Sequence, residues 1–501
     1  MTTAIVVGGG SAGSVVARRL ADAGIQVALL EAGGEDANPA IHDPARMAEL
    51  WHGPNDWDYR TVPQQHAGGR RLHLPRGKVL GGSHALNAMI WVRGAAWDFD
   101  TWAALGCDGW SWHDVLPVYE QLEGELPIVG DYPLEPVQQA IVDAYVQEGV
   151  EFNPDYNGER QDGVSQQQVT LVDGRRVDTY MAFLKPVRDA VDVHTGAHVH
   201  SVIVEDGAAT GVRYRDDTGR MRVRHADHVV LCGGALDSPQ ILLRSGIGPR
   251  AELEALGIDV VADAPDVGAN LHDHLLSPVV FATGRPVGPP VPGVSVTQTH
   301  AFWRSQPDLP VPDTQPIHFS VPMYGEDLPP VGDDGFSLMA GIVSPRSRGR
   351  LRLTGAGLDD PVEIDLQALA DDADVASLVA SVRQMRRVGR RPALAAEWGA
   401  TEVYPGEHVG DDELEDYVRR TAITYHHQVG TCRMGADAAS VVDPRLRVRG
   451  VTGLRVVDAS IMPQITTGNT NAPAVLIGEM GARMLLEDLD RPLPRGERME
   501  A

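Results

Sequence analysis

A hydrophobic run, a glycine-rich turn and a helical pattern follow one another at the start of the chain. Residues 5–7 (Ile-Val-Val) are a β-branched run, which is typical of a buried strand. From Ser11 to Ala23 the apolar positions recur at helical spacing, and Gly24 is placed to end this helix. The run from Gln26 to Glu31 predicts a second strand that ends on an acidic residue. The pattern therefore predicts a strand–helix–strand unit.

The turn of this unit carries glycines at Gly8, Gly10 and Gly13. Glycines at this spacing let the backbone approach a pyrophosphate, and the N-terminus of the following helix offers free N–H groups and a positive dipole. Glu31 can accept hydrogen bonds from an adenosine ribose. The order strand, turn, helix, strand and acid favours a dinucleotide site over an ordinary strand–helix–strand unit.

Similar patterns continue along the rest of the chain. Residues 125–187 are mixed and loop-rich, so we interpret them as an insertion. Between Gly284 and Gly335 prolines are frequent and aromatic residues are interspersed, which fits a β-rich second domain with a partly apolar pocket, although these aromatic side chains could equally form its core. The remaining predicted elements are a surface helix over 110–122, antiparallel strands over 191–204 and 210–224, a buried strand over 228–233, a helix and turn over 234–248, an amphipathic helix over 375–388, a strand end at 456–460 and a final helix over 473–486.

Composition narrows the class of protein. A chain of 501 residues can bury large cores, and we expect two intertwined domains. The net charge of −26 argues against nucleic acid and anionic membranes as partners. The three cysteines, Cys107, Cys232 and Cys432, have no metal-binding spacing and suit a reducing compartment. No long apolar run and no basic leader is evident, so the sequence predicts a cytoplasmic protein without a membrane span.

A second glycine-rich segment runs from Arg76 to Gly94. It contains Gly81-Gly82-Ser83 followed by small and apolar residues. Such a turn can press the backbone flat against a planar ring, although a purely structural Gly-Gly turn is the simpler alternative if the segment is considered alone.

Six stretches, taken in order, resemble the glucose–methanol–choline (GMC) family of FAD-dependent oxidoreductases. They are the N-terminal glycines with Glu31 and the segments 77–100, 234–248, 427–435, 458–463 and 469–473. The resemblance extends from residue 5 to residue 486. Together with the patterns above it predicts an α/β fold (α+β overall), in which a Rossmann-like FAD-binding domain is interleaved with a substrate domain built on an antiparallel sheet. It predicts that residues 1–124, 188–283 and 420–501 form the FAD-binding domain and that residues 125–187 and 284–419 form the substrate-binding domain.

The resemblance also implies which residues contact FAD. Family members that attach FAD covalently through a histidine carry it where this chain has Leu86, so the cofactor should be non-covalent. His84 stands where the family usually has a small residue, and it is the alternative linker. The positions that match family contacts are Gly8, Gly10, Ser11, Ala12, Gly13, Glu31, Ala32, Trp57, Leu80, Gly82, Ser83, Asn87, Ala88, Met89, Ile90, Val199, Asp458, Ala459, Thr470 and Asn471.

The family pattern places the catalytic pair at His427 and Asn469. Oxidation of an alcohol needs a base close to the hydroxyl, and a histidine titrates near neutral pH. His426 and Tyr425 are candidates for the substrate pocket, although neighbouring side chains usually diverge and His426 could equally be only packed. His272 and His274 could be read as metal ligands, but their place before the second domain favours a structural role, so we expect no metal.

These observations predict FAD-dependent oxidation of an alcohol to the aldehyde, with proton removal by histidine and hydride transfer to flavin N5. A primary alcohol with an apolar or aryl body is favoured. The alternatives are a cyanohydrin-type lyase with non-redox FAD and oxidation of a sugar or choline. The sequence leaves open whether oxygen or a quinone-type acceptor reoxidises the flavin, and it leaves open the oligomeric state.

Overall fold

A five-stranded parallel sheet forms one half of the computed structural model, which describes residues 2–492. Its strand order is β25-β13-β1-β2-β9, and every pairing is parallel. The strands are β1 (Thr3–Val7), β2 (Gln26–Leu30), β9 (Val191–His194), β13 (His228–Leu231) and β25 (Leu454–Val456). The β-branched run of β1 is buried because both faces of the sheet are covered. The predicted strand–helix–strand unit is therefore confirmed.

Two helices cross closely beside this sheet. Helix α1 (Ser11–Asp22) connects β1 to β2 and ends before Gly24, which has a φ of +76°. Helix α11 (Asn471–Asp488) packs against it, and a Cβ on Gly478 would lie 2.7 Å from the carbonyl oxygen of Ala12. Only glycine permits this close crossing, which brings the N-termini of the two helices together.

Antiparallel strands β10 (His198–Glu205), β11 (Ala208–Arg215) and β12 (Met221–His225) pack against β13 and helix α6 (Gly234–Arg244). The antiparallel prediction is confirmed for these strands but is wrong for residues 191–194, since β9 joins β2 in parallel. The predicted surface helix is α4 (Trp112–Glu123), whose apolar face is buried against α11.

An antiparallel sheet forms the other half of the molecule. Its main strand order is β23-β17-β20-β19-β18-β6, and β16 joins β20 to β24. Helices α5 (Pro136–Gln147) and α8 (Asp372–Gly389) cover one face. The strands are β6 (Gly163–Gln166), β16 (Leu275–Ser277), β17 (Val280–Ala282), β18 (Thr297–Phe302), β19 (Ile317–Phe319), β20 (Gly335–Ile342), β23 (Thr401–Tyr404) and β24 (Ile423–Thr424).

The domain division remains a prediction, but sheet membership bears on its limits. Strands β16, β17 and β24 pair within the antiparallel sheet, although they lie in segments that we assigned to the FAD-binding domain. Residue 1 and residues 493–501 of that predicted domain lie outside the described residues.

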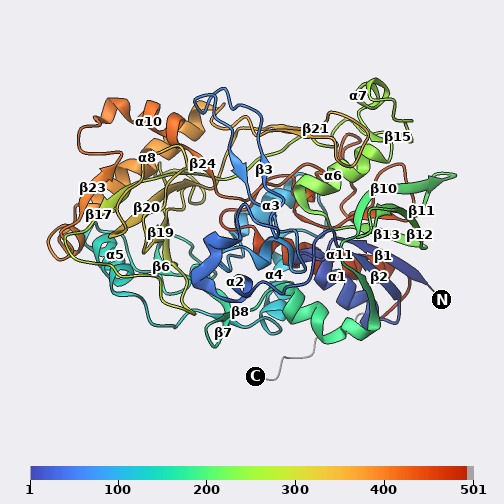
Figure 1. The fold of residues 1–501 in the computed structure, drawn as a ribbon, viewed down its shortest axis with the longest axis horizontal. Helices are drawn as coiled ribbons and strands as arrows, with labels where there is room; N and C mark the ends of the chain where they lie inside the picture. Colours follow the sequence, from blue (N-terminus) through green and yellow to red (C-terminus); the bar gives the residue numbers. More distant parts are fainter. Residues whose placement is uncertain (1, 493–501) are drawn as a thin grey trace.

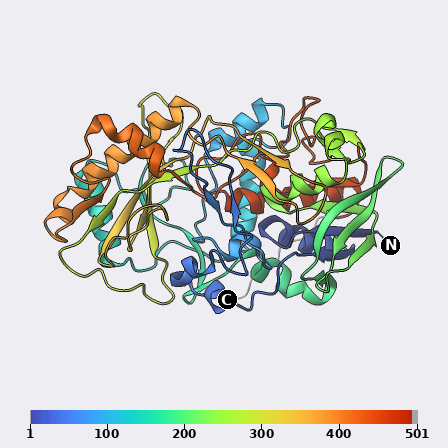
Figure 2. The same cartoon turned by 45° about the horizontal axis from the view of Figure 1, so that its top comes forward.

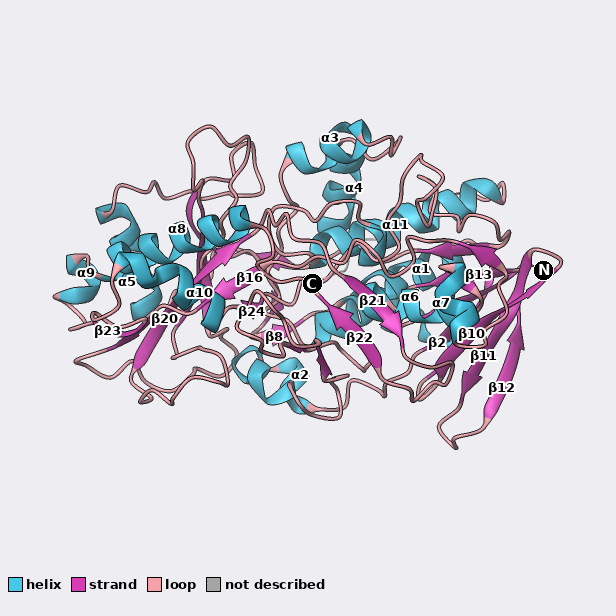
Figure 3. Cartoon of the chain, turned by 90° about the horizontal axis from the view of Figure 1, so that it is seen from above, coloured by secondary structure: helices cyan, strands magenta, loops and turns pink. Residues whose placement is uncertain are grey.

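The two sheets lie at opposite ends of the molecule. Figure 1 shows the parallel sheet near the N-terminus at the right and the antiparallel sheet at the left. The segment around residues 40–90, drawn in blue, runs between them in Figures 1 and 2. Figure 3 shows that this junction consists mostly of loops. No helix among residues 2–492 is long and apolar enough to cross a membrane.

The remaining elements are short or connect these layers. They are α2 (Pro39–His42), η1 (Pro44–Leu50), β3 (Tyr59–Arg60), β4 (His73–Leu74), η2 (Gly82–Ala85), α3 (Ala96–Ala104), β5 (Ile128–Val129), β7 (Val169–Val172), β8 (Arg175–Arg176), η3 (Tyr180–Leu184), η4 (Lys185–Ala190), β14 (Ile247–Gly248), α7 (Arg250–Ala255), β15 (Ala262–Asp263), β21 (Arg350–Leu353), β22 (Val362–Asp365), α9 (Pro392–Ala395), η5 (Asp411–Glu413), α10 (Leu414–Thr421) and η6 (Ala459–Ile461).

Candidate active site

A cavity of about 520 Å³ lies at the junction of the two halves. One end is lined by the glycine turn after β1 and by the N-termini of α1 and α11. The other end is lined by side chains of β16, β19 and β20 and by the segment after β24. The cavity therefore joins the predicted cofactor residues to the predicted catalytic residues.

The glycine turn leaves no room for side chains. A Cβ on Gly8 would lie 2.5 Å from the carbonyl oxygen of Cys232, and a Cβ on Gly82 would lie 2.7 Å from the Cα of Gly10. A Cβ on Gly13 would lie 1.9 Å from the carbonyl oxygen of Gly8, which explains this glycine by close packing of helix on strand. The bare backbone of Gly8 and Gly82 forms one wall of the cavity.

Two helix N-termini meet beside this wall. The Ser11 hydroxyl at the start of α1 donates a 2.7 Å hydrogen bond to Oδ1 of Asn471 at the start of α11. The Asn471 Nδ2 group is buried and has no hydrogen-bond partner. Since helix N-termini carry partial positive charge, this part of the cavity suits an anionic ligand with hydrogen-bond acceptors.

The Glu31 carboxylate is hydrogen-bonded to backbone N–H groups, one of them in the glycine turn. Its two carboxylate oxygens accept hydrogen bonds of 2.8 Å from the N–H groups of Gly9 and Gly33. Burial raises the pKa of Glu31 to about 7, against the lowering effect of these two backbone donors. The side chain also lines the cavity, so it is available to a ligand at this end.

Most of the predicted cofactor residues line the same cavity. Three of them, Gly13, Leu80 and Met89, do not line it. The side chains of Leu80 and Met89 are buried in the surrounding core. The predicted residues that line it are Gly8, Gly10, Ser11, Ala12, Glu31, Ala32, Trp57, Gly82, Ser83, Asn87, Ala88, Ile90, Val199, Asp458, Ala459, Thr470 and Asn471.

The two candidate linkage positions differ in orientation. Leu86 lines the cavity. His84 is fully buried away from it, and its Nε2 atom lies 3.1 Å from the Thr170 hydroxyl. A histidine in this orientation does not present a ring nitrogen to a ligand in the cavity.

His427 lies at the centre of a line of hydrogen bonds. Its Nδ1 atom is 3.0 Å from Nδ1 of His274, and its Nε2 atom is 3.3 Å from Nδ2 of Asn469. The ring of Tyr425 stacks on it at a centroid distance of 4.6 Å. The backbone N–H of His427 donates to Asp273 over 2.7 Å. The ring is thus fixed on several sides while it lines the cavity.

Burial lowers the pKa of His427 well below its ordinary value. The neighbouring rings of His274 and His426 and the guanidinium of Arg76 lower it further. The imidazole is therefore neutral at neutral pH, and one ring nitrogen can accept a proton.

A hydrogen bond from Gln315 orients the side-chain amide of Asn469. The Gln315 Nε2 group donates a 2.9 Å hydrogen bond to Oδ1 of Asn469 and also lies 3.2 Å from Nδ1 of His300. This contact directs the Asn469 Nδ2 group, a donor, toward His427. Gln315 is fully buried and was missed by the sequence analysis, since no local pattern marks a glutamine as a partner of a residue so distant in the chain.

His426 and His427 both line the cavity, although the side chains of neighbouring residues usually diverge. His426 has a φ of +66°, in the left-handed region, so its ring turns to a different wall and meets Trp51 edge-on. Its carbonyl oxygen accepts a hydrogen bond from Nη2 of Arg76. Burial lowers the pKa of His426 to about 3.

The two histidines before the second sheet have different surroundings. His272 uses both ring nitrogens within the backbone framework, because Nδ1 lies 2.6 Å from the carbonyl of Asn270 and Nε2 accepts from Ile465 over 2.9 Å. This agrees with the structural role predicted for it. His274 is also buried, but it contacts His427 directly, which the sequence analysis missed.

The walls around His427 are apolar. Ile317 and Phe319 alternate along β19, so both face the cavity, while His318 between them points to the Tyr145 hydroxyl of α5 at 2.9 Å. The other apolar and aromatic lining residues of this end are Met47, Trp51, Leu276, Met323, Tyr324, Met339, Ile423 and Tyr425. The aromatic residues noted in the sequence between 300 and 340 thus contribute both to the cavity and to the core, where Phe302 is buried.

Comparisons with known proteins identify the family of this chain. Two family models described as GMC oxidoreductase match residues 2–276 and 345–478. An alcohol dehydrogenase (acceptor) from Pseudomonas putida is 38% identical over 97% of this chain and 96% of its own. An oxygen-dependent choline dehydrogenase from Brucella ovis is 35% identical over 96% and 95% of the two chains. The crystal structure of pyridoxine 4-oxidase from Mesorbium loti superposes with a TM-score of 0.92 and 35% identity, and covers 97% of this chain and 99% of that one.

The matched family consists of FAD-binding enzymes, and the residues of the cavity fit this cofactor. The bare glycine backbone and the paired helix N-termini suit a pyrophosphate. The unpartnered Nδ2 group of Asn471 is a buried donor that a bound ligand would satisfy.

Proposed function

This chain belongs to the GMC oxidoreductase family and binds FAD, and from that premise we propose that it oxidises an alcohol to the aldehyde. The proposal rests above all on the His427–Asn469 pair, whose neutral imidazole and amide donor stand 3.3 Å apart at the cavity wall. A base and a hydrogen-bond donor at this spacing can hold one hydroxyl oxygen between them.

The roles of the two residues follow from their donors and acceptors. When His427 donates from Nδ1 to His274, its Nε2 atom carries the lone pair. This lone pair accepts from the Asn469 amide in the structure, and it can take the hydroxyl proton once the alcohol oxygen lies between the two side chains. The Nδ2 group of Asn469 donates to the same oxygen and holds the carbon that bears it in a fixed direction. FAD supplies the acceptor for the hydride when it is bound.

The environment of His427 favours this use as a base. Its pKa is lowered by burial, so the ring does not carry a proton before the substrate binds. The stacked ring of Tyr425 and the contact to His274 restrict its rotation. A base that is already oriented loses little entropy when the substrate arrives.

We propose an alcohol with an uncharged, apolar or aryl body as the substrate. The support is the apolar wall formed by Leu276, Ile317, Phe319 and Met339 beside the catalytic pair. Among the described residues that line the cavity, the acidic side chains are Glu31, Asp237 and Asp458 at the cofactor end and Glu326 and Asp327 at the mouth. The carboxylate of Asp273 lies behind the His427 backbone and does not line the cavity. A quaternary ammonium group next to His427 would therefore have no lining carboxylate beside it, which disfavours choline.

The electron acceptor is the open part of the proposal. The relatives include one protein named for an unspecified acceptor and one named as oxygen-dependent. Reduction of the holoenzyme by substrate, followed by separate mixing with oxygen and with a quinone, decides between them by the faster reoxidation rate.

A substrate panel under anaerobic conditions tests the activity itself. We expect benzyl-type or aliphatic primary alcohols to bleach the visible flavin absorption. Preference for choline or a sugar by more than about 100-fold in kcat/KM, or about 2.7 kcal/mol, would contradict the apolar-substrate proposal. Absence of bleaching with every alcohol would contradict the oxidation itself.

A further inference from the structure

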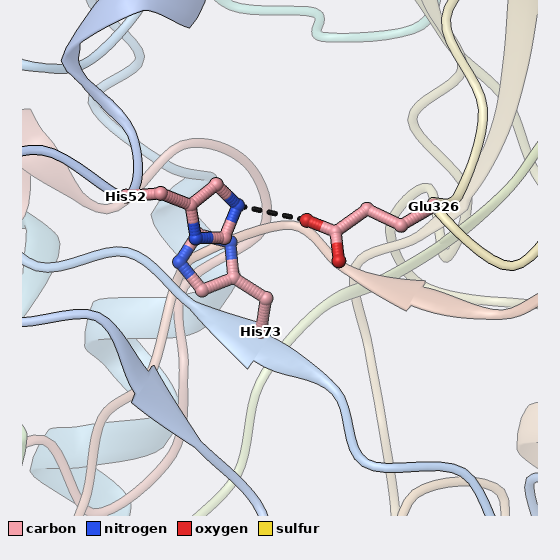
Figure 4. Close-up of side chains that lie close together, drawn as sticks. All are labelled: His52, His73 and Glu326. Atoms are coloured by element: carbon pink, nitrogen blue, oxygen red, sulfur yellow. Dashed lines mark ion pairs between the residues drawn. The ribbon is translucent and has the colours of Figure 1, made fainter.

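A group of histidine and carboxylate side chains lies at the mouth of the cavity, apart from the catalytic pair. His52 follows η1, His73 is on β4, and Glu326 is in the loop between β19 and β20. All three line the cavity mouth. The Nε2 atom of His52 lies 2.7 Å from Oε1 of Glu326. Figure 4 marks this ion pair with a dashed line. The two imidazole rings stack with their centroids 3.9 Å apart.

Donor atoms of these side chains converge in two overlapping sets. One ring nitrogen of His52, one of His73 and one carboxylate oxygen of Glu326 lie within 4.8 Å of one another. A second set shares His73 and adds carboxylate oxygens of Asp56, which is buried, and Asp58, which is exposed, again within 4.8 Å. Each set therefore places three potential ligand atoms within reach of one ion.

The charges at this position favour a cation. Three carboxylates, those of Asp56, Asp58 and Glu326, surround the two imidazole rings. One arginine, Arg60, pairs with Glu326, since its Nη2 atom lies 3.5 Å from that carboxylate. The Nε2 atom of His73 is buried and makes no well-aligned hydrogen bond, although two carboxylates lie 3.1 and 3.3 Å from it. An ion bound here would take the place of the proton that these two carboxylates attract to the nitrogen.

We propose that His52, His73 and Glu326 bind a divalent transition-metal ion at the cavity mouth. Imidazole nitrogen with carboxylate oxygen is a ligand set that Zn²⁺ accepts, and the neighbouring carboxylate of Asp58 can complete it. Coordination requires the two rings to turn out of their stacked orientation, in which their planes differ by 27°. The exposed side chain of His52 can make this rotation.

No metal is expected from the sequence, and these three ligands come from separate segments that show no motif spacing. Their approach depends on the fold. The ion would link the loop between β19 and β20 to the segments around η1 and β4. An ion pair between Arg70 and Asp327, at 2.8 Å, already links this loop to the segment before β4. Metal binding would therefore hold this loop over the mouth of the cavity.

Zinc titration of the holoenzyme, purified without a histidine tag, tests the proposal by calorimetry. We expect one Zn²⁺ per chain. The variants His52→Ala and Glu326→Gln should each weaken binding at least tenfold, while His113→Ala, which changes an exposed histidine on α4, should leave it unchanged. Equal affinity in all four proteins would mean an adventitious ion only and would overturn the proposal.

Cobalt provides a readout that an ion-pair network does not give. Co²⁺ bound to imidazole and carboxylate ligands absorbs at longer wavelengths than oxidised flavin. We expect this absorption in the parent protein and in His113→Ala, and its loss in His52→Ala and Glu326→Gln, whose flavin spectra should stay intact as a check on folding. A parent protein that shows no such band with Co²⁺ has only an ion-pair network at the mouth, and the metal site is then refuted.

Discussion

The Nδ1 atoms of His274 and His427 lie 3.0 Å apart, so one of these rings donates a proton to the other. The Nδ2 group of Asn469 lies 3.3 Å from Nε2 of His427 and can only donate. His427 therefore accepts at Nε2 and donates at Nδ1, and His274 accepts at its own Nδ1. Burial lowers the pKa of His274 to about 3, so its ring is neutral and its one proton is on Nε2. The tautomer that a base needs is thus built into the buried network.

The first prediction concerns His427 as the base. His427→Ala should lower the rate constant of flavin reduction by about 10²–10⁴-fold in anaerobic stopped-flow experiments, the usual contribution of a positioned base. FAD content should be unchanged, because the predicted cofactor contacts lie elsewhere in the cavity. Unchanged reduction in His427→Ala together with lost reduction in His426→Ala would exchange the roles of the two histidines.

The pH profile follows from the same environment. Since burial lowers the pKa of His427 below its ordinary value, the parent enzyme should keep a constant reduction rate through neutral pH and lose it only in acid. This acid limb should disappear in His427→Ala. Asp273 provides a control, because burial raises its pKa to about 7. A limb near pH 7 that survives in His427→Ala but vanishes in Asp273→Asn would belong to that carboxyl.

The second prediction concerns Gln315, which orients the Asn469 amide. Gln315→Leu removes one neutral hydrogen bond, so we expect a loss of about 0.5–1.5 kcal/mol, or roughly 2- to 12-fold, in kcat/KM. Because the amide of Asn469 can then rotate, the loss should appear in the rate of flavin reduction more than in substrate affinity. Asn469→Ala should remove the amide itself, and adding Gln315→Leu to it should cost little more. Additive losses in the double variant would show that Gln315 acts independently of Asn469.

The sequence predicted the fold and the outline of the cavity because local patterns carry that information. The run at Ile5 and the helix that ends at Gly24 depend on neighbours in the chain, and both are found where predicted. The parallel pairing of β9 was not predicted, since an alternating pattern does not show which strand lies beside it. The contacts of Gln315 with Asn469 and of His52 with Glu326 join distant segments, and only the folded chain brings them together.

The third prediction concerns the attachment of FAD. Leu86 lines the cavity at the position where a histidine would form the covalent bond, and His84 points away from it. FAD should therefore remain in the supernatant when the holoenzyme is precipitated with acid. Flavin that stays with the precipitate, and that migrates with a peptide containing residues 84–86 after proteolysis, would contradict this prediction.

The last prediction concerns the effect of the buried His84 ring on how the free energy of unfolding depends on pH. Burial, with a smaller effect of Arg176, lowers the pKa of His84 to about 3, whereas an unfolded histidine titrates near pH 6.5. Between these values the unfolded chain binds a proton that the folded chain excludes. The contribution of the neutral ring is therefore complete above about pH 6.5 and is lost as the pH falls toward 3, by about 1.4 kcal/mol per pH unit.

His84→Gln removes this titration while it keeps a polar side chain near the Thr170 hydroxyl. Between pH 7 and pH 5 the free energy of unfolding in urea should fall by about 2 kcal/mol less in His84→Gln than in the parent protein. The other buried histidines titrate equally in both proteins, so their effects cancel. His113→Gln, which changes an exposed ring, should follow the parent. Parallel pH curves for the parent protein and His84→Gln would show that His84 is accessible to protons in the folded state, contrary to its burial in the core.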